Sequence, residues 1–219
     1  MALSGRSTVI VLLAVNLSVL CFSANAQTEP SAAITKIDLK TSRVYVLVDK
    51  TGLGHQHGVA GRLQGGKLNL GARTKAGQIV FDMASFVADT EEARKYVGLE
   101  GKTDAATKKK VNDNMRGPDV LNVMKYPNAT FDIDSAIETG KASSSGNPLY
   151  ELKGSFTLHG VIRPLTVIAE VVSGDQSTHV RGQFKVLQSQ FGMKPYAAAL
   201  GAVGVADELT IWGEIDLKQ

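Results

Sequence analysis

The sequence predicts a mainly β protein: an antiparallel β-barrel of about eight strands, with one or two helices inserted. Three observations lead to this fold class. Most segments alternate apolar and polar residues with a period of two, which is typical of half-buried strands. The segment from residue 150 to 172 has the pattern of a β-hairpin, and only residues 88–127 change to a helical period. Closure into a barrel is favoured because it leaves no exposed sheet edges.

The hairpin of residues 150–172 has the clearest pattern in the chain. In its first strand, Leu152, Phe156 and Leu158 alternate with polar residues, and its second strand alternates in the same way. Gly160 permits a tight turn between the strands, and Pro164 fixes φ where the second strand can begin. One face of the hairpin is therefore dry, and we expect the other strands to close around it.

Shorter alternating segments predict the remaining strands. They cover residues 34–39, 44–48, 55–63, 67–70, 78–86, 129–137, 178–188 and 208–218. The first two are either separate strands or one bent strand. Gly65 and Gly66 interrupt the next pair, which predicts either a kink in one strand or a hairpin.

One or two helices are expected between residues 88 and 127, and two segments have the pattern. The first covers residues 90–96, where Thr90 is a suitable N-cap and two glutamates occupy the first turn. The second covers residues 103–115, capped by Thr103 or Asp104, with Val111 and Met115 spaced to share one face. These helices would cross or flank the sheet.

The N-terminus has the pattern of a secretory signal peptide at residues 1–26. Arg6 precedes an apolar run at residues 9–20, and Ala24-Asn25-Ala26 matches a cleavage site. We therefore expect a mature domain of residues 27–219 that is periplasmic or secreted. Cys21 precedes the cut, so the mature chain would contain no thiol; lipoprotein processing at Cys21 is the alternative, although Leu20 before it is larger than that processing prefers.

Charge and hydropathy limit the partners. The formal net charge is +3, or +2 without Arg6. So balanced a domain is not expected to bind nucleic acid, which usually requires a strongly basic surface. No stretch after the leader is apolar for long enough to span a bilayer, so stable membrane insertion is not expected.

Few residues suggest catalysis, nucleotide binding or metal binding. The sequence contains no G-x-S-x-G elbow and no H-E-x-x-H helix, and Gly101-Lys102-Thr103 lacks the first glycine of a P-loop. His55 and His57 are two residues apart on one expected strand, so both face the interior near one mouth. Three interpretations are open. The two histidines belong to a polar rim at the mouth, or they contact the head group of a ligand, or they are two ligands of a Zn²⁺ or Cu²⁺ site that needs a third.

Two further patterns concern the faces of the sheet. Glycines recur at inward positions, where they either leave room for a ligand or relieve crowding in a filled core. They are Gly61, Gly154, Gly182 and Gly213. Several carboxylates fall at outward positions and are expected to be solvated. They are Asp82, Asp132, Asp134, Glu170, Glu214 and Asp216.

Four segments together resemble the YceI-like family of exported bacterial proteins, also called polyisoprenoid-binding proteins. The resemblance runs from about residue 34 to 218. It rests on GVAGRL at residues 58–63, YPNATF at 126–131, GSFTLHGVIRPL at 154–165, and QFGM at 190–193 followed by DELTI at 207–211.

The resemblance implies a lipocalin-like barrel with a long apolar tunnel that holds an isoprenoid lipid, either a polyprenyl phosphate or a quinone-like molecule. It implies no catalytic residue and no cofactor, and it allows a homodimer. The tail would lie against Val46, Val59, Leu63, Phe81, Met83, Phe131, Leu152, Phe156, Val167, Phe184 and Ile211. The polar end would meet His55, His57 and Arg163. A metal-dependent enzyme that uses His55 and His57, and a structural or stress-response protein without a ligand, are the alternatives.

Overall fold

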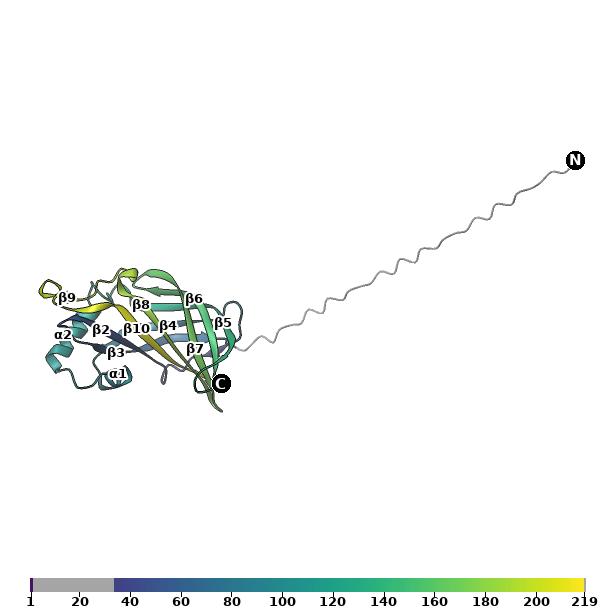
Figure 1. Cartoon of the computed structure of the whole chain (residues 1–219), viewed down its shortest axis with the longest axis horizontal. Coiled ribbons are helices and arrows are strands. Elements are labelled where there is room, and N and C mark those ends of the chain that lie inside the picture. The colour runs from purple at the N-terminus through teal and green to yellow at the C-terminus, as the bar shows by residue number, and fades with distance from the viewer. Residues whose placement is uncertain (2–33, 219) are drawn as a thin grey trace. The chain divides into compact units, whose positions relative to one another are not determined.

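Eight antiparallel strands form a closed barrel in this computed structural model, which describes Met1 and residues 34–218 (Figure 1). The barrel strands are β2 (Arg43–Gly52), β3 (His57–Leu68), β4 (Gly77–Ala88), β5 (Asn128–Ala142), β6 (Pro148–Leu158), β7 (Val161–Ser173), β8 (Ser177–Leu187) and β10 (Val203–Lys218). Two-residue strands, β1 (Thr35–Lys36) and β9 (Ala197–Ala198), pair with β3 and β10. The expected fold class is confirmed.

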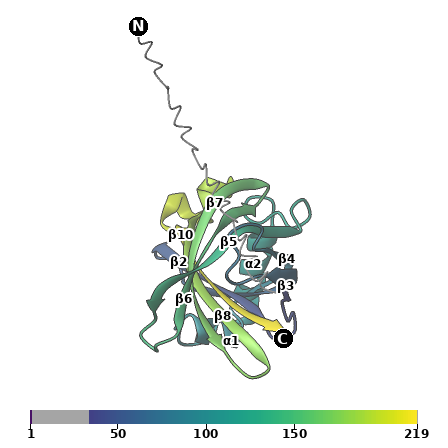
Figure 2. The same cartoon turned by 90° about the vertical axis from the view of Figure 1, so that its right-hand side faces the viewer.

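The strands follow one another around the barrel in sequence order. Each of β2 to β8 pairs with the next, and β10 pairs with both β8 and β2, which closes the ring. Ile211 of β10 lies opposite Phe184 on one side and Val46 on the other. Figure 2 shows the barrel from the end that carries the C-terminus.

Two strand predictions need correction. Residues 57–68 form one continuous strand, β3, with a register shift between Leu63 and Gly65. The kink was therefore the correct interpretation of the two glycines, and the hairpin was wrong. Residues 34–39 contribute only β1 and a single bridge from Ile37 to Leu217. The expected signal peptide, with Cys21, lies outside the described residues.

Both expected helices are present, between β4 and β5. Helix α1 (Glu91–Tyr96) is capped by the Thr90 hydroxyl, which accepts from the Ala93 N–H at 3.0 Å. It packs closely on β3 because Gly58 has no side chain: a Cβ there would lie 2.9 Å from the Ala93 carbonyl group.

Helix α2 (Ala105–Arg116) lies at one end of the barrel, and the C-terminus lies at the other (Figure 1). The Asp104 carboxylate caps α2 by accepting from two backbone N–H groups at 3.0 Å. The buried Asn112 amide exchanges two hydrogen bonds with the Ala88 backbone, and Arg116 donates to the Phe86 carbonyl oxygen at 2.9 Å. These bonds fasten α2 to the end of β4. Among the described residues, no helix has the length and hydropathy needed to cross a bilayer.

Glu214 on the outer face of β10 was expected to be solvated, but in the structure it is buried. The Glu214 carboxylate accepts hydrogen bonds from Tyr96 of α1, from Arg181 Nε at 2.7 Å and from His179 Nε2 at 2.6 Å. Burial raises the pKa of Glu214, but these hydrogen bonds outweigh it and hold the pKa below its usual value. Period-two alternation correctly placed Glu214 outside the barrel but could not show that α1 covers it.

The barrel interior is filled towards the end that holds β1 and is hollow towards α2. Leu68 and Ile133, which are fully buried, belong to the filled part. Towards the hollow part, the Phe86 ring lies over Gly61, where an added Cβ would approach the ring to 2.4 Å. Gly61 therefore makes room for the Phe86 side chain. At this position the inward glycine relieves crowding and does not leave space for a ligand.

Candidate ligand-binding cavity

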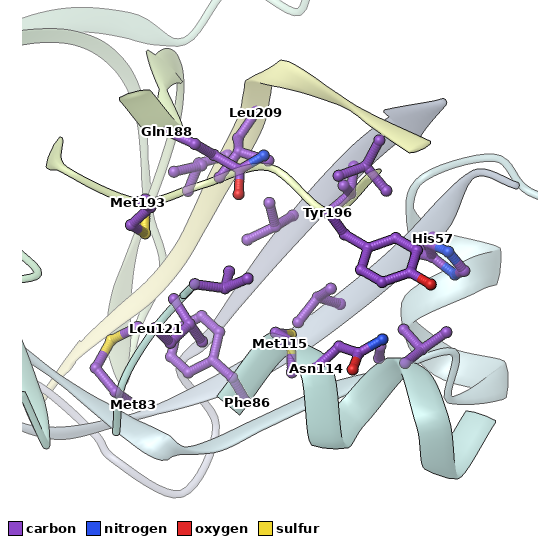
Figure 3. Close-up of a pocket in the computed structure, with 18 of the residues that line it drawn as sticks. His57, Met83, Phe86, Asn114, Met115, Leu121, Gln188, Met193, Tyr196 and Leu209 are labelled. Carbon is purple, nitrogen blue, oxygen red and sulfur yellow. The ribbon is translucent and has the colours of Figure 1, made fainter. Parts of the chain in front are cut away.

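A cavity of about 290 Å³ occupies the hollow end of the barrel, between the strands and α2 (Figure 3). Apolar side chains form most of its wall. From the strands they are Val44, Val46, Val48, Val59, Phe81, Met83, Phe86, Ala88, Ala129, Phe156, Leu158, Phe184, Val203, Val205, Leu209 and Ile211. Val111, Met115, Val120, Leu121 and Met193 complete it from α2 and the loops. Such a cavity has the size and lining typical of sites for apolar small molecules.

Most polar side chains of the cavity gather on one side; the exception, Gln188, lies near Met193, is buried and donates to the Ala206 carbonyl oxygen at 2.8 Å. In Figure 3, His57, Asn114 and Tyr196 lie together, whereas Met83 and Met193 lie on the opposite side. His55, Thr107 and Lys110 also border the cavity. His55 and Lys110 are exposed, so the cavity reaches solvent on this side. The arrangement suits an amphiphile, with a tail along the apolar wall and a polar group at the opening.

The His57 ring is held in place by a buried carboxylate. Asp89, whose side chain is fully buried, accepts from His57 Nδ1 at 2.8 Å, from the Thr103 hydroxyl at 2.9 Å and from Arg94 Nη1 at 3.2 Å. Burial raises the pKa of Asp89, but the hydrogen bonds from His57, Thr103 and Arg94 outweigh it and lower the pKa. Asp89 is therefore ionised at neutral pH.

This network decides which nitrogen of His57 is available to a ligand. A carboxylate only accepts hydrogen bonds, so Nδ1 carries the proton that joins His57 to Asp89. Nε2 has no partner among the described residues and belongs to a ring that lines the cavity. A neutral His57 would accept from a ligand hydroxyl through Nε2, and a protonated His57 would donate to a phosphate or carbonyl oxygen.

A second, smaller cavity of about 50 Å³ lies deeper in the barrel. Four side chains, Val44, Phe81, Phe184 and Ile211, line both cavities and form a partition between them. Phe156 packs edge-on against the rings of Phe81 and Phe184, with centroids 5.9 Å and 5.8 Å away. Aromatic side chains thus close the inner end of the main cavity.

The structure places most of the predicted tail-binding residues around these two cavities. Seven line the main cavity: Val46, Val59, Phe81, Met83, Phe156, Phe184 and Ile211. Phe131, Leu152 and Val167 line only the smaller one. Leu63 is buried but borders neither cavity.

Only two of the three residues predicted to meet the polar end of the ligand border the main cavity. His55 and His57 border the main cavity, whereas Arg163 borders neither and donates to the Gln190 carbonyl oxygen at 3.2 Å from an exposed position. Sequence reasoning missed Lys110, Asn114 and Tyr196. The shared face of Val111 and Met115 was the available signal for α2, because both of these residues line the cavity.

A metal site has little support in this geometry. Within residues 34–218, no group of three or more His, Cys, Asp and Glu side chains is arranged to hold a metal ion. His57 and the exposed His55 are the only His, Cys, Asp or Glu residues among the described residues that border the cavity, and a firm site needs a third ligand.

Comparisons with solved structures agree with the fold. BcnA of Burkholderia cenocepacia is 21% identical, with a TM-score of 0.52, over 82% of this chain and 98% of that chain. A polyisoprenoid binding domain from Saccharophagus degradans, implicated in plant cell wall breakdown, is 12% identical, with a TM-score of 0.55, over 84% and 97%. At these identities the likeness concerns the barrel itself.

Sequence comparisons identify the family. A UPF0312 protein of Azotobacter vinelandii (strain DJ / ATCC BAA-1303) is 28% identical over 117 residues, which cover 50% of this chain and 58% of that protein. The chain thus spans little more than half the length of this curated relative. The model of the YceI-like domain matches residues 36–217. Because that match runs from β1 almost to the end of β10, the chain belongs to the YceI-like family.

Proposed function

We propose that this protein binds and carries an isoprenoid lipid, with the tail in the main cavity and the polar end beside His57. The observation that carries the proposal is a largely apolar cavity of about 290 Å³ in which His57, Asn114 and Tyr196 lie together on one side. Each buried methylene contributes about 0.8 kcal/mol. An apolar tail can therefore bind tightly without specific contacts along its length. The similar barrel described as a polyisoprenoid binding domain supports this class of ligand.

The polar end of the ligand is proposed to be a phosphate or a quinone-like ring. Lys110, Asn114 and Tyr196 offer hydrogen-bond donors beside His57, and the two candidate groups present oxygen acceptors. This set replaces Arg163 as the expected partner of the polar end. Binding requires no bond to be broken, so the proposal includes no catalytic step.

The proposed setting is the periplasm or the extracellular space. The signal-peptide pattern of residues 1–26 supports export. A protein that shields an apolar tail from water would be useful in such an aqueous compartment. The homodimer that the resemblance allows stays a prediction.

The direct experiment is native mass spectrometry of the protein purified from its own host, followed by solvent extraction of bound molecules. A reproducible added mass that extracts as a prenyl lipid would establish the function and identify the cargo. A protein that is empty and takes up no added prenol would favour a filled core with a structural role.

A matched pair of variants ties binding to the cavity. Leu121 is half-buried in the loop after α2 and lines the cavity, so Leu121→Asp places a charge against the tail. Leu39→Asp makes the same change at the opposite end of the barrel, where Leu39 is exposed. We expect at least a tenfold loss of prenol affinity for Leu121→Asp alone. Equal affinities in two folded variants would exclude this cavity as the tail site.

A further inference from the structure

Three loops at the cavity end of the barrel each carry a large, exposed apolar side chain. They are residues 53–56 between β2 and β3, residues 117–127 between α2 and β5, and residues 188–202 between β8 and β10. Leu53 is 80% exposed, and Met124 and Leu200 are almost completely exposed. One such residue is ordinary on a protein surface, but here all three surround one opening.

Hydrogen bonds bring the three loops together around that opening. The Leu53 N–H donates to the Ala202 carbonyl oxygen at 2.9 Å, and the Lys194 N–H donates to the Asp119 carbonyl oxygen at 2.7 Å. The same loops supply part of the cavity wall. Gly54, Leu121 and Tyr196 line it, one from each loop. We call Leu53, Met124 and Leu200 the apolar rim.

Lysines stand beside the apolar rim without acidic partners. Lys110 borders the cavity and Lys125 directly follows Met124. Neither forms an ion pair within residues 34–218, whereas Lys109 pairs with Asp113 at 2.6 Å. No carboxylate of the described residues pairs with either ammonium group, although Lys125 Nζ lies 5.1 Å from the centroid of the Tyr126 ring, so both lysines are available to an external anion.

We propose that the apolar rim docks the open end of the barrel onto an anionic lipid bilayer, so that cargo passes between the bilayer and the cavity. Single apolar side chains on loops, flanked by unpaired lysines, suit shallow insertion at a membrane interface, where hydrocarbon and anionic head groups lie side by side. The proposal rests on the lipid-binding function, because the bilayer is the phase that holds such a cargo.

The test is flotation of the full protein with vesicles of phosphatidylcholine, with and without phosphatidylglycerol. The variant Leu53→Ser/Leu200→Ser removes two rim residues that do not line the cavity. The control Leu39→Ser/Val172→Ser changes two residues that are 38% and 40% exposed near the other end of the barrel. We expect wild type and control to float with the vesicles, more strongly with phosphatidylglycerol and less strongly at high salt. The rim variant should bind at least tenfold more weakly.

Parallel uptake of geranylgeraniol separates this proposal from the proposed function. The rim variant should take up geranylgeraniol as wild type does. A wild type that takes up geranylgeraniol but binds no vesicles, or a rim variant that binds vesicles normally, would overturn docking alone. Vesicle binding without uptake would overturn the lipid-binding function instead. If wild type is a dimer that the rim variant dissociates, and neither binds vesicles, the apolar rim contacts a second copy and docking is wrong.

Discussion

Phe184 is predicted to limit the length of the tail that the protein accepts. Its side chain belongs to the partition between the two cavities, so Phe184→Ala should join them. At the roughly 12 Å³ that one water-sized group requires, the smaller cavity of about 50 Å³ has room for about four such groups, and a methylene is of similar size. At about 0.8 kcal/mol per group, a tail long enough to reach it would gain about 3 kcal/mol, which is more than about a hundredfold in Kd.

The variant should remain folded. Truncation of a fully buried phenylalanine to alanine costs about 3–5 kcal/mol, and Phe184 already borders empty space on two sides, so we expect a cost of about 3 kcal/mol. A domain of this size has about 5–15 kcal/mol of stability. Denaturant unfolding would measure the loss.

The assay is calorimetric titration with prenols of increasing chain length. Wild-type affinity should stop rising once the tail fills the main cavity, and Phe184→Ala should extend the rise to longer tails. Phe191→Ala is the matched control, because Phe191 also packs on Phe156, with ring centroids 5.7 Å apart, but borders neither cavity. An unchanged length profile in folded Phe184→Ala, or the same extension in Phe191→Ala, would refute this role of the partition.

Two further predictions concern stability. The hydrogen bond to Glu214 raises the pKa of His179, so His179 stabilises the fold fully below about pH 6.5 and loses this effect as pH rises through its raised pKa. In urea unfolding, His179→Gln should therefore lose more stability at about pH 5.5 than at about pH 9, and an equal loss would contradict the reasoning. Gly61→Ala should destabilise by about 1–3 kcal/mol, because its Cβ would clash with Phe86. Gly65→Ala has open space at the same strand and should be nearly neutral; similar thermal shifts for both would count against the clash.

The barrel could be predicted because a period of two records which side of a strand each residue faces. That rule placed Phe81, Phe156 and Ile211 inside, and all three line the main cavity. The rule carries no information about depth along the barrel axis. Leu63 and Phe131 have the same inward pattern, yet the former borders neither cavity and the latter only the smaller one.

Residues outside the strands were harder to predict. Lys110 and Asn114 reach the cavity because α2 is bonded to the end of β4 through Asn112, a tertiary contact with no local sequence pattern. The burial of Glu214 similarly depends on α1. Arg163 was chosen for its chemistry alone, and its guanidinium instead bonds a backbone carbonyl.

The ring closure through β10 has a consequence for the order of events during folding. Strand β10 pairs with β2, near the other end of the barrel sequence, and Ile211 of β10 lines both cavities. A folding chain therefore has no finished binding site until its last strand has docked. Such pairing between distant segments is intrinsically slow. A lipid that meets the chain during this interval can be enclosed as the last strand docks, so loading and folding can be one kinetic event.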